Sequence, residues 1–247
     1  CDLDRDGRLD FVVAELGSFI PEDHDLGKVI WLRERDLSGL FESKVLLDGL
    51  GRVADVQAAD FDADGDTDLV VAEFGYHRTG RVLLLEQKSS EAGLPIFVSK
   101  TLDSRHGAIH VPVADLNGDG HLDFVALISQ EHEVIIAFLG DGDGAFERMP
   151  INAASDPSFG SSGIQLVDFD TDGDVDVLFT NGDTFDSYDL KPYHGIRWLE
   201  NQGRFPFVTH HLTNMPGVHR AIAGDLDADG DLDVVACALL PEKLLQG

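Results

Sequence analysis

The sequence predicts an all-β protein built from four-stranded blades, that is, part of a β-propeller. An acidic nine-residue pattern occurs five times, the offsets between its copies are 58, 55, 53 and 57 residues, and a β-rich run directly follows every copy. Four-stranded units that repeat at nearly constant spacing are typical of propeller blades, which are arranged around a central channel. No segment has the apolar periodicity of a helix.

Each full repeat divides into four apolar runs separated by Gly, Asn, Asp and Ser, and these runs predict strands. The predicted strands are 53–59, 69–73, 81–87 and 96–102 in the second repeat, 109–114, 124–128, 134–139 and 146–151 in the third, and 164–167, 177–180, 196–200 and 207–212 in the fourth. The runs are apolar rather than strictly alternating, which fits blades that pack on both faces.

The first and last repeats are incomplete. The predicted blades are 1–50 (partial), 51–107, 108–160, 161–214 and 215–247 (partial), all within one propeller domain that spans residues 1–247. The first repeat lacks the inner strand before its acidic pattern, and the last stops after the strand that follows it, so 17 strands are expected. We therefore expect an arc of about four and a half blades from a larger ring, with further sequence before residue 1.

The composition excludes several classes of partner. The 247 residues carry a formal net charge of −28, and 43% of them are hydrophobic. Nucleic acids and anionic membrane surfaces require clustered Lys and Arg, so neither is an expected partner. The longest apolar runs, such as 134–139, are too short to insert into a bilayer. Disorder is also excluded, because the acidic residues are clustered while Val, Leu, Ile and Phe are abundant.

The repeated pattern, D-x-[DN]-x-D-G-x-x-D, has the chemistry of a calcium loop. Calcium takes about six to eight oxygen ligands at about 2.3–2.6 Å. Side chains at positions 1, 3, 5 and 9 are expected to converge on the ion, position 7 to offer its backbone carbonyl, and Gly at position 6 to permit the sharp turn. The predicted side-chain ligands are Asp2, Asp4, Asp6 and Asp10; Asp60, Asp62, Asp64 and Asp68; Asp115, Asn117, Asp119 and Asp123; Asp168, Asp170, Asp172 and Asp176; and Asp225, Asp227, Asp229 and Asp233. The predicted carbonyl ligands are those of Arg8, Asp66, His121, Asp174 and Asp231.

We therefore expect up to five Ca²⁺ ions that act structurally, with the weakest binding where Asn117 replaces a carboxylate. Zinc fits poorly, because no Cys or His stands at a side-chain ligand position. Magnesium remains possible but requires stricter octahedral geometry. Turn formation alone would not require four carboxylates in nine residues, which repel one another without a cation. An EF-hand is excluded, because its twelve-residue loop ends in Glu and is flanked by helices.

The loop and the β-run after it resemble the FG-GAP/VCBS repeat family, which includes the blades of integrin α-subunit propellers. The resemblance implies a seven-bladed ring, calcium held by these aspartates in the hairpin between the first and second strands, and an extracellular or periplasmic location. Segments 195–212 and 217–236 resemble a secreted bacterial branch of the family. Of the FG-GAP motif that names the family, only Phe74-Gly75 is present, so the resemblance does not imply integrin-like ligand recognition for this chain.

Histidines concentrate on the face that should lie opposite the calcium loops. They occur in or beside the loops between second and third strands (His24, His77, His132, His194) or near blade entries (His106, His110, His219), with Glu15, Glu73 and Arg220 nearby. Such a rim could bind a ligand or a transition metal, or do acid–base work, but polar loops also carry histidines without function. The long loop 182–194 is the best candidate for a contact element.

The first functional hypothesis is an exported, calcium-stabilised scaffold, adhesion or ligand-binding module. Its expected partner is a protein or carbohydrate ligand on the face opposite the calcium loops, and no catalytic residue is assigned. Two alternatives stay open: a carbohydrate-active lyase or dehydratase with a His/Glu rim, and an accessory domain of a larger periplasmic redox protein. The two cysteines, Cys1 and Cys237, form either one distant pair or, as we expect, two free thiols.

Overall fold

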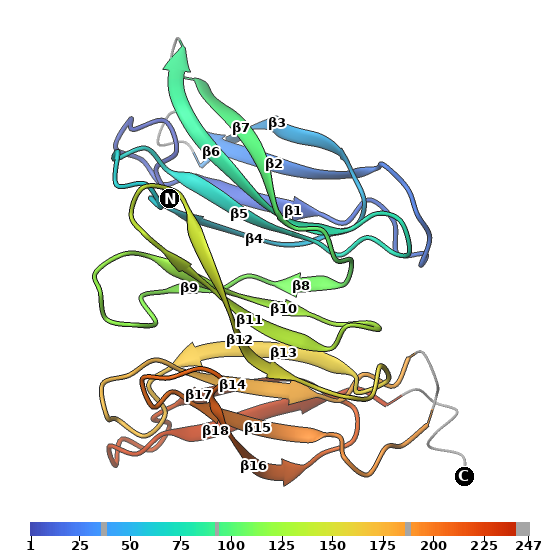
Figure 1. Ribbon diagram of the computed structural model, residues 1–247. Coiled ribbons are helices and arrows are strands. Elements are labelled where there is room, and N and C mark those ends of the chain that lie inside the picture. Colours follow the sequence, from blue (N-terminus) through green and yellow to red (C-terminus); the bar gives the residue numbers. More distant parts are fainter. Residues whose placement is uncertain (36–38, 92–93, 186–188, 241–247) are drawn as a thin grey trace. The chain divides into compact units, whose positions relative to one another are not determined.

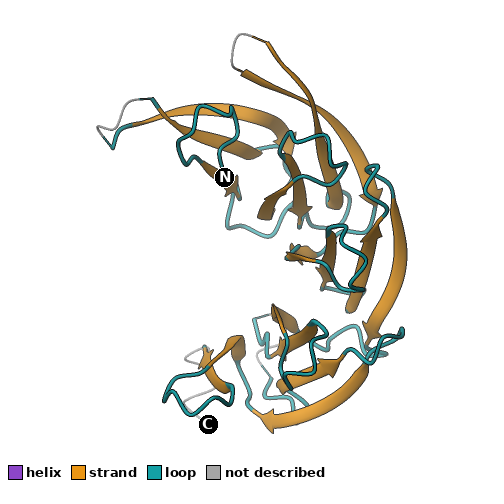
Figure 2. Cartoon of the chain, turned by 90° about the vertical axis from the view of Figure 1, so that its left-hand side faces the viewer, coloured by secondary structure: helices purple, strands orange, loops and turns teal. Residues whose placement is uncertain are grey.

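A computed structural model describes residues 1–35, 39–91, 94–185 and 189–240. These residues form strands and loops and contain no helix (Figures 1 and 2). The predicted all-β class is therefore confirmed. In this part of the chain there is accordingly no apolar helix long enough to cross a membrane. Cys1 and Cys237 are both free and exposed, as expected.

The described residues contain 18 strands, and their boundaries agree closely with the apolar runs of the sequence. The strands are β1 (Phe11–Glu15), β2 (Gly27–Glu34), β3 (Phe41–Leu50), β4 (Val53–Ala59), β5 (Asp68–Glu73), β6 (Arg81–Glu91), β7 (Leu94–Asp103), β8 (Ala108–His110), β9 (Val113–Ala114), β10 (Asp123–Ile128), β11 (Val134–Gly140), β12 (Phe146–Ala153), β13 (Ser161–Val167), β14 (Asp176–Asn181), β15 (Gly195–Glu200), β16 (Val208–Asn214), β17 (Val218–Gly224) and β18 (Asp233–Ala238).

The chain divides into two compact units, residues 1–113 with 140–146 and residues 114–139 with 147–247. In the first unit, β4-β5-β6-β7 form a four-stranded antiparallel sheet, and β1-β2-β3 form a three-stranded one (Figure 1). In the second unit, β13-β14-β15-β16 form a four-stranded antiparallel sheet, β17 pairs with β18, and β10-β11-β12 are neighbours in strand order. Sequential four-stranded antiparallel sheets are the expected topology of a propeller blade.

The inner strand of the third repeat differs from its prediction. A single strand was expected over 109–114, but the chain forms two short strands, β8 and β9, with Val111 and Pro112 between them. Pro112 has no N–H to donate to a neighbouring strand. The N–H of Val111 donates instead to Asp55 Oδ2 at 3.0 Å. This break raises the strand number from the expected 17 to 18.

The central strands are buried on both faces. Every residue of β5, β10 and β14 is buried, which confirms the expectation drawn from their continuous apolar runs. Strand β1 instead alternates: Phe11 and Val13 are exposed, whereas Val12 and Ala14 pack against the core of the first unit. Thus β1 buries one face, and β5 buries both.

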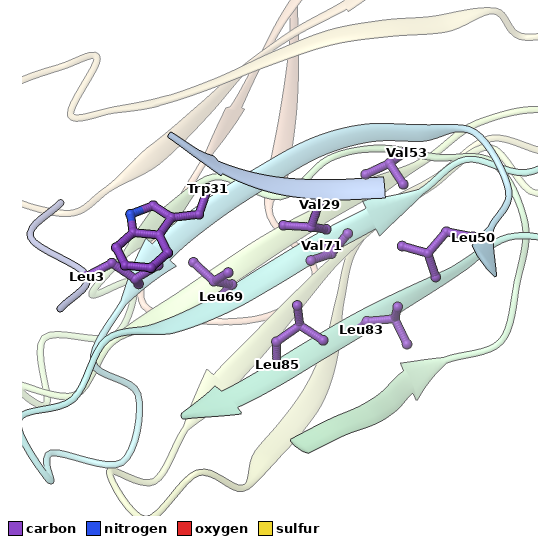
Figure 3. Close-up of a cluster of buried hydrophobic side chains, with 9 residues drawn as sticks. All are labelled: Leu3, Val29, Trp31, Leu50, Val53, Leu69, Val71, Leu83 and Leu85. Atoms are coloured by element: carbon purple, nitrogen blue, oxygen red, sulfur yellow. The ribbon is translucent and has the colours of Figure 1, made fainter. Parts of the chain in front are cut away.

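The core of the first unit extends from its two sheets to the acidic loop at the start of the chain (Figure 3). Trp31 is fully buried there, beside Val29 and Leu69. Leu3, the second residue of the loop, belongs to the same cluster and is 1% exposed. The equivalent Phe61 and Leu116 are 2% and 3% exposed. Because burial of a large apolar side chain is worth about 1.5–3 kcal/mol, these residues anchor their loops to the cores.

Candidate metal centres in the five acidic loops

All five acidic loops share one backbone conformation. Glycine at position 6 has a positive φ in every copy, as the sequence predicts: Gly7 (84°), Gly65 (85°), Gly120 (86°), Gly173 (100°) and Gly230 (96°). Position 4 is also left-handed in every copy: Arg5 (59°), Ala63 (54°), Gly118 (72°), Thr171 (61°) and Ala228 (62°). This second requirement was not predicted, because only one copy carries the glycine that usually signals such a conformation.

Two of the aspartates in each loop are held by the backbone of the loop itself. The position 1 carboxylate accepts the N–H of the position 6 glycine at 2.9–3.2 Å in all five copies. The position 5 carboxylate accepts the N–H of the position 7 residue at 2.7–3.0 Å, again in all five. Such local side-chain bonds stabilise tight turns. They also fix the carboxylates in place without any help from an ion.

The position 9 aspartate fastens each loop to its sheet. Its Oδ2 accepts the N–H of the position 2 residue at 2.8–3.1 Å in every copy. In the first, second and fourth loops, Oδ1 also accepts an N–H from the strand that pairs with the one after the loop, or from the residue just after that strand. The donors are Glu34 of β2, Gln87 of β6 and Asn201 after β15, the last at 2.7 Å from Asp176. Asp176 is fully buried, whereas Asp233 of the last loop is exposed. The sequence predicted position 9 only as a ligand; its partners show that it is also a structural clamp.

Three carboxylates approach one another closely in four of the loops. In each group, one potential ligand atom per residue lies within 4.8 Å of the others: Asp2, Asp4 and Asp6; Asp60, Asp62 and Asp68; Asp168, Asp170 and Asp176; and Asp225, Asp227 and Asp229. Since calcium binds oxygen at about 2.3–2.6 Å, two oxygens on one ion lie at most about 5 Å apart. The donors are hard oxygens at a suitable spacing, so these four loops fit a calcium ion.

The third loop lacks this arrangement, and the first loop combines it with basic side chains. In the third loop, no three acidic or histidine side chains meet the same spacing among the residues that the structure describes. There Asn117 is bonded to Asp119 twice: its Nδ2 donates to Oδ2 at 2.9 Å, and its Oδ1 accepts the backbone N–H at 3.0 Å. In the first loop, the guanidinium of Arg33 contacts Asp4 and lies 3.8 Å from Asp6. The guanidinium of Arg8 also contacts Asp6. That loop therefore already contains two cations from the chain.

Burial and mutual repulsion raise the pKa of several loop carboxyls. Burial raises the pKa of Asp68 to about 6, against the opposing effect of backbone N–H bonds. Burial and the neighbouring carboxylates also raise the pKa of Asp62 and of Asp170. A divalent cation among these oxygens would favour their charged forms and reverse the shift.

Two histidines of the predicted rim lie against one another within the first unit: the ring centroids of His77 and His106 are 6.4 Å apart. His24 and His110 have separate partners. In the first unit, His24 Nδ1 accepts the N–H of Leu26 at 3.1 Å, and His77 lies against Tyr76 with ring centroids 4.0 Å apart. His110 Nδ1 is 3.6 Å from a carboxylate oxygen of Asp55.

In the second unit, His194 is fully buried, and neither of its ring nitrogens has a hydrogen-bond partner among the described residues. The ring of His219 is 5.5 Å from that of Phe185. Within the described residues, none of His24, His77, His110, His194 and His219 belongs to a group of three potential metal ligands. Residues 186–188 of the candidate contact loop 182–194 lie outside the described residues.

The loops and sheets correspond to a known repeat. The model of the FG-GAP-like repeat matches residues 2–71 and 115–179, which together make up more than half of the chain. The chain belongs to the FG-GAP-like repeat family. Each matched segment starts at the first aspartate of one acidic loop and ends in the strand after the next loop, β5 or β14. Each matched segment thus spans one structural repeat together with the acidic loop of the next repeat. No curated protein matches the chain in sequence.

Proposed function

We propose that this FG-GAP-like chain is a calcium-stabilised β-propeller module that acts as an extracellular or periplasmic scaffold and ligand-binding domain. The observation that carries the proposal is the convergence of three carboxylates, within 4.8 Å, in four of the five acidic loops. The aspartates at positions 1, 3, 5 and 9 would hold the ion together with the position 7 carbonyl. When bound, the ion supplies positive charge that cancels repulsion among them.

The proposed location follows from the expected affinity. Extracellular calcium modules bind with Kd values of about 10⁻⁴–10⁻³ M, so such sites would stay nearly empty in the cytosol. At about 1 mM calcium, a site with a Kd of about 10⁻⁴ M adds about 1.4 kcal/mol to the free energy of unfolding. Two such sites would add about 3 kcal/mol, a large part of the roughly 5–15 kcal/mol that stabilises a typical domain.

Thermal unfolding in calcium and in EGTA, at constant ionic strength, tests the structural role. Two filled sites should raise the melting temperature by roughly 5–10 °C, and the same concentration of magnesium should raise it less. The double substitution Asp62→Asn with Asp170→Asn should remove most of the calcium effect. Asp143→Asn, an exposed aspartate in the turn between β11 and β12, is the matched control. Equal melting temperatures in calcium and EGTA would refute the structural role.

The ligand-binding role is proposed for the connections at the other ends of the strands. In the second unit, the connection from β12 to β13 and the end of the loop before β15 border a cavity of about 410 Å³. This volume lies within the range of about 300–1,000 Å³ that is typical of small-molecule sites. A protein or carbohydrate ligand would therefore contact loops that the calcium-binding hairpins leave free.

A further inference from the structure

The cavity of the second unit combines aromatic walls with one half-buried cation. Phe159, in the β12–β13 connection, and Tyr193, just before β15, have nearly parallel rings whose centroids are 5.8 Å apart. The guanidinium carbon of Arg197, on β15, lies 4.8 Å from the centroid of Phe159. These three side chains line the cavity together with Ala153 and Ala154. Flat apolar walls of this kind suit the C–H faces of a ring-shaped ligand.

Arg197 lacks the anionic partner that a half-buried cation normally has. One of its terminal nitrogens donates to Asn181 Oδ1 and the other to the backbone carbonyl of Tyr193 at 2.8 Å, so both of these acceptors are neutral. Among the described residues, no carboxylate lies within 4.0 Å of it, although the chain carries 46 acidic residues against 18 basic ones. Burial accordingly lowers the pKa of Arg197. A guanidinium has five N–H donors in a fork that matches a carboxylate, so several remain for a ligand.

The rest of the lining is suited to hydroxyl groups. Asn152 Nδ2 donates to Thr209 Oγ1 at 3.0 Å, which leaves the amide oxygen and the hydroxyl proton free to bond a ligand. Asp156 accepts the N–H and the hydroxyl of Ser158 at 2.9 and 2.8 Å, and these bonds lower its pKa. Asp156 is therefore an ionised acceptor at neutral pH. Its negative charge also disfavours ligands with several anionic groups, such as phosphate or polysulfate.

We propose that this cavity binds a uronic acid, a sugar unit with a single carboxylate, as part of an acidic polysaccharide. The ligand carboxylate pairs with Arg197, the sugar ring lies along Phe159 and Tyr193, and its hydroxyls bond to Asn152, Thr209 and Asp156. The inference rests on the proposed ligand-binding role of these connections but does not require calcium, since none of the lining residues belongs to an acidic loop.

The test titrates the full chain with D-galacturonate and D-glucuronate, observed by saturation-transfer NMR and calorimetry. D-galactose, D-glucose and acetate are the reference probes. We expect at least one uronate to bind at least tenfold more tightly than the matching neutral sugar and than acetate. Arg197→Gln should weaken that binding at least tenfold, and Arg204→Gln, at an exposed arginine in the loop between β15 and β16, should leave it unchanged. If Arg197→Gln does not fold, the double variant Asn152→Ala with Thr209→Val decides, with a loss of at least fivefold expected.

Three results would overturn the inference. The first is that neither uronate binds saturably up to 50 mM, a concentration on the order of the Kd of a weakly bound single sugar. The second is that neutral sugars or acetate bind as tightly as the uronates, and the third is that the cavity variants bind uronate as tightly as the wild type. The titrations are run in calcium and in EGTA. Absence of uronate binding in a protein that calcium still stabilises would eliminate this inference alone. Uronate binding without any calcium stabilisation would eliminate only the structural role of the ions.

Discussion

The position 9 aspartates should stabilise the protein even in the absence of calcium, and Asp176 gives the clearest test. Its two carboxylate oxygens accept the N–H groups of Phe169 at 3.1 Å and of Asn201 at 2.7 Å, and the side chain is fully buried. Asp176→Ala leaves both N–H groups without this partner. Each buried unpaired group costs about 1–3 kcal/mol, so we expect the two together to lower the free energy of unfolding by about 2–6 kcal/mol.

Two matched variants separate this clamp from ion binding. Asp233→Ala, at the equivalent position of the last loop, removes one bond at 3.1 Å to Leu226, which is 67% exposed. Because water can replace that bond, the expected loss is below about 1 kcal/mol. Asp170→Ala removes a candidate ligand from the same loop as Asp176 but breaks no clamp, so it should lower stability only when calcium is present.

Urea unfolding in EGTA measures the three variants, with far-UV circular dichroism and tryptophan fluorescence as signals. Trp198 reports on this loop, because its ring centroid lies 5.3 Å from that of Phe169. If Asp176→Ala does not fold, Asp176→Asn, which keeps one acceptor oxygen, should show a smaller loss than expected for Ala. Equal losses for Asp176→Ala and Asp170→Ala in EGTA would refute the clamp.

Three further predictions concern charge, strain and pH. Arg33→Met removes one of the two guanidiniums that contact carboxylates of the first loop and leaves that of Arg8. Calcium should then bind there about tenfold more tightly, measured as an added calorimetric step, and an unchanged isotherm would contradict this. Thr171→Gly should raise the free energy of unfolding by about 1 kcal/mol, because it removes the strain of a β-branched residue held in the left-handed conformation. Gly173→Ala should lower it by about 1–2 kcal/mol, because it introduces such strain. Urea midpoints that move in the opposite directions would refute the shared loop conformation. Burial lowers the pKa of His194 to about 4, below the value of about 6.5 in an unfolded chain. As the pH falls from about 6.5 toward 4, the unfolded chain takes up a proton at this histidine before the folded protein does, so the free energy of unfolding should decrease. His194→Gln should remove up to about 3 kcal/mol of that decrease. If urea unfolding gives the wild type and the variant the same pH dependence, the prediction is contradicted.

The strands could be predicted from the sequence because each is a short apolar run between turn residues. The strand predicted over 69–73 is found as Asp68–Glu73, and the one predicted over 196–200 as Gly195–Glu200. The break between β8 and β9 was missed, although Pro112 marked it. The hydrogen bond that accompanies this break could not be predicted from the neighbouring sequence, because Asp55, which accepts the N–H of Val111, lies 56 residues away.

The ligand residues of the candidate metal centres could be predicted from the sequence, but the contacts that surround them could not. Position and residue type identified the aspartates, because a cation site requires several oxygens within one short loop. The second bond of Asp176 comes from Asn201, 25 residues away, and one of the two cations in the first loop comes from Arg33 on β2. Arg197 was not singled out, because only the fold shows that it is half buried without a carboxylate partner.

Equilibrium dialysis against calcium tests the central claim most directly, because it counts the ions that the loops hold. At 1 mM free calcium we predict at least two ions per chain, held first by the second and fourth loops, where a buried position 9 aspartate joins each group of three. Asp62→Asn and Asp170→Asn should each remove one ion, and Asp143→Asn none. No saturable calcium binding up to 10 mM, on the order of ten times the weakest expected Kd, would contradict the account.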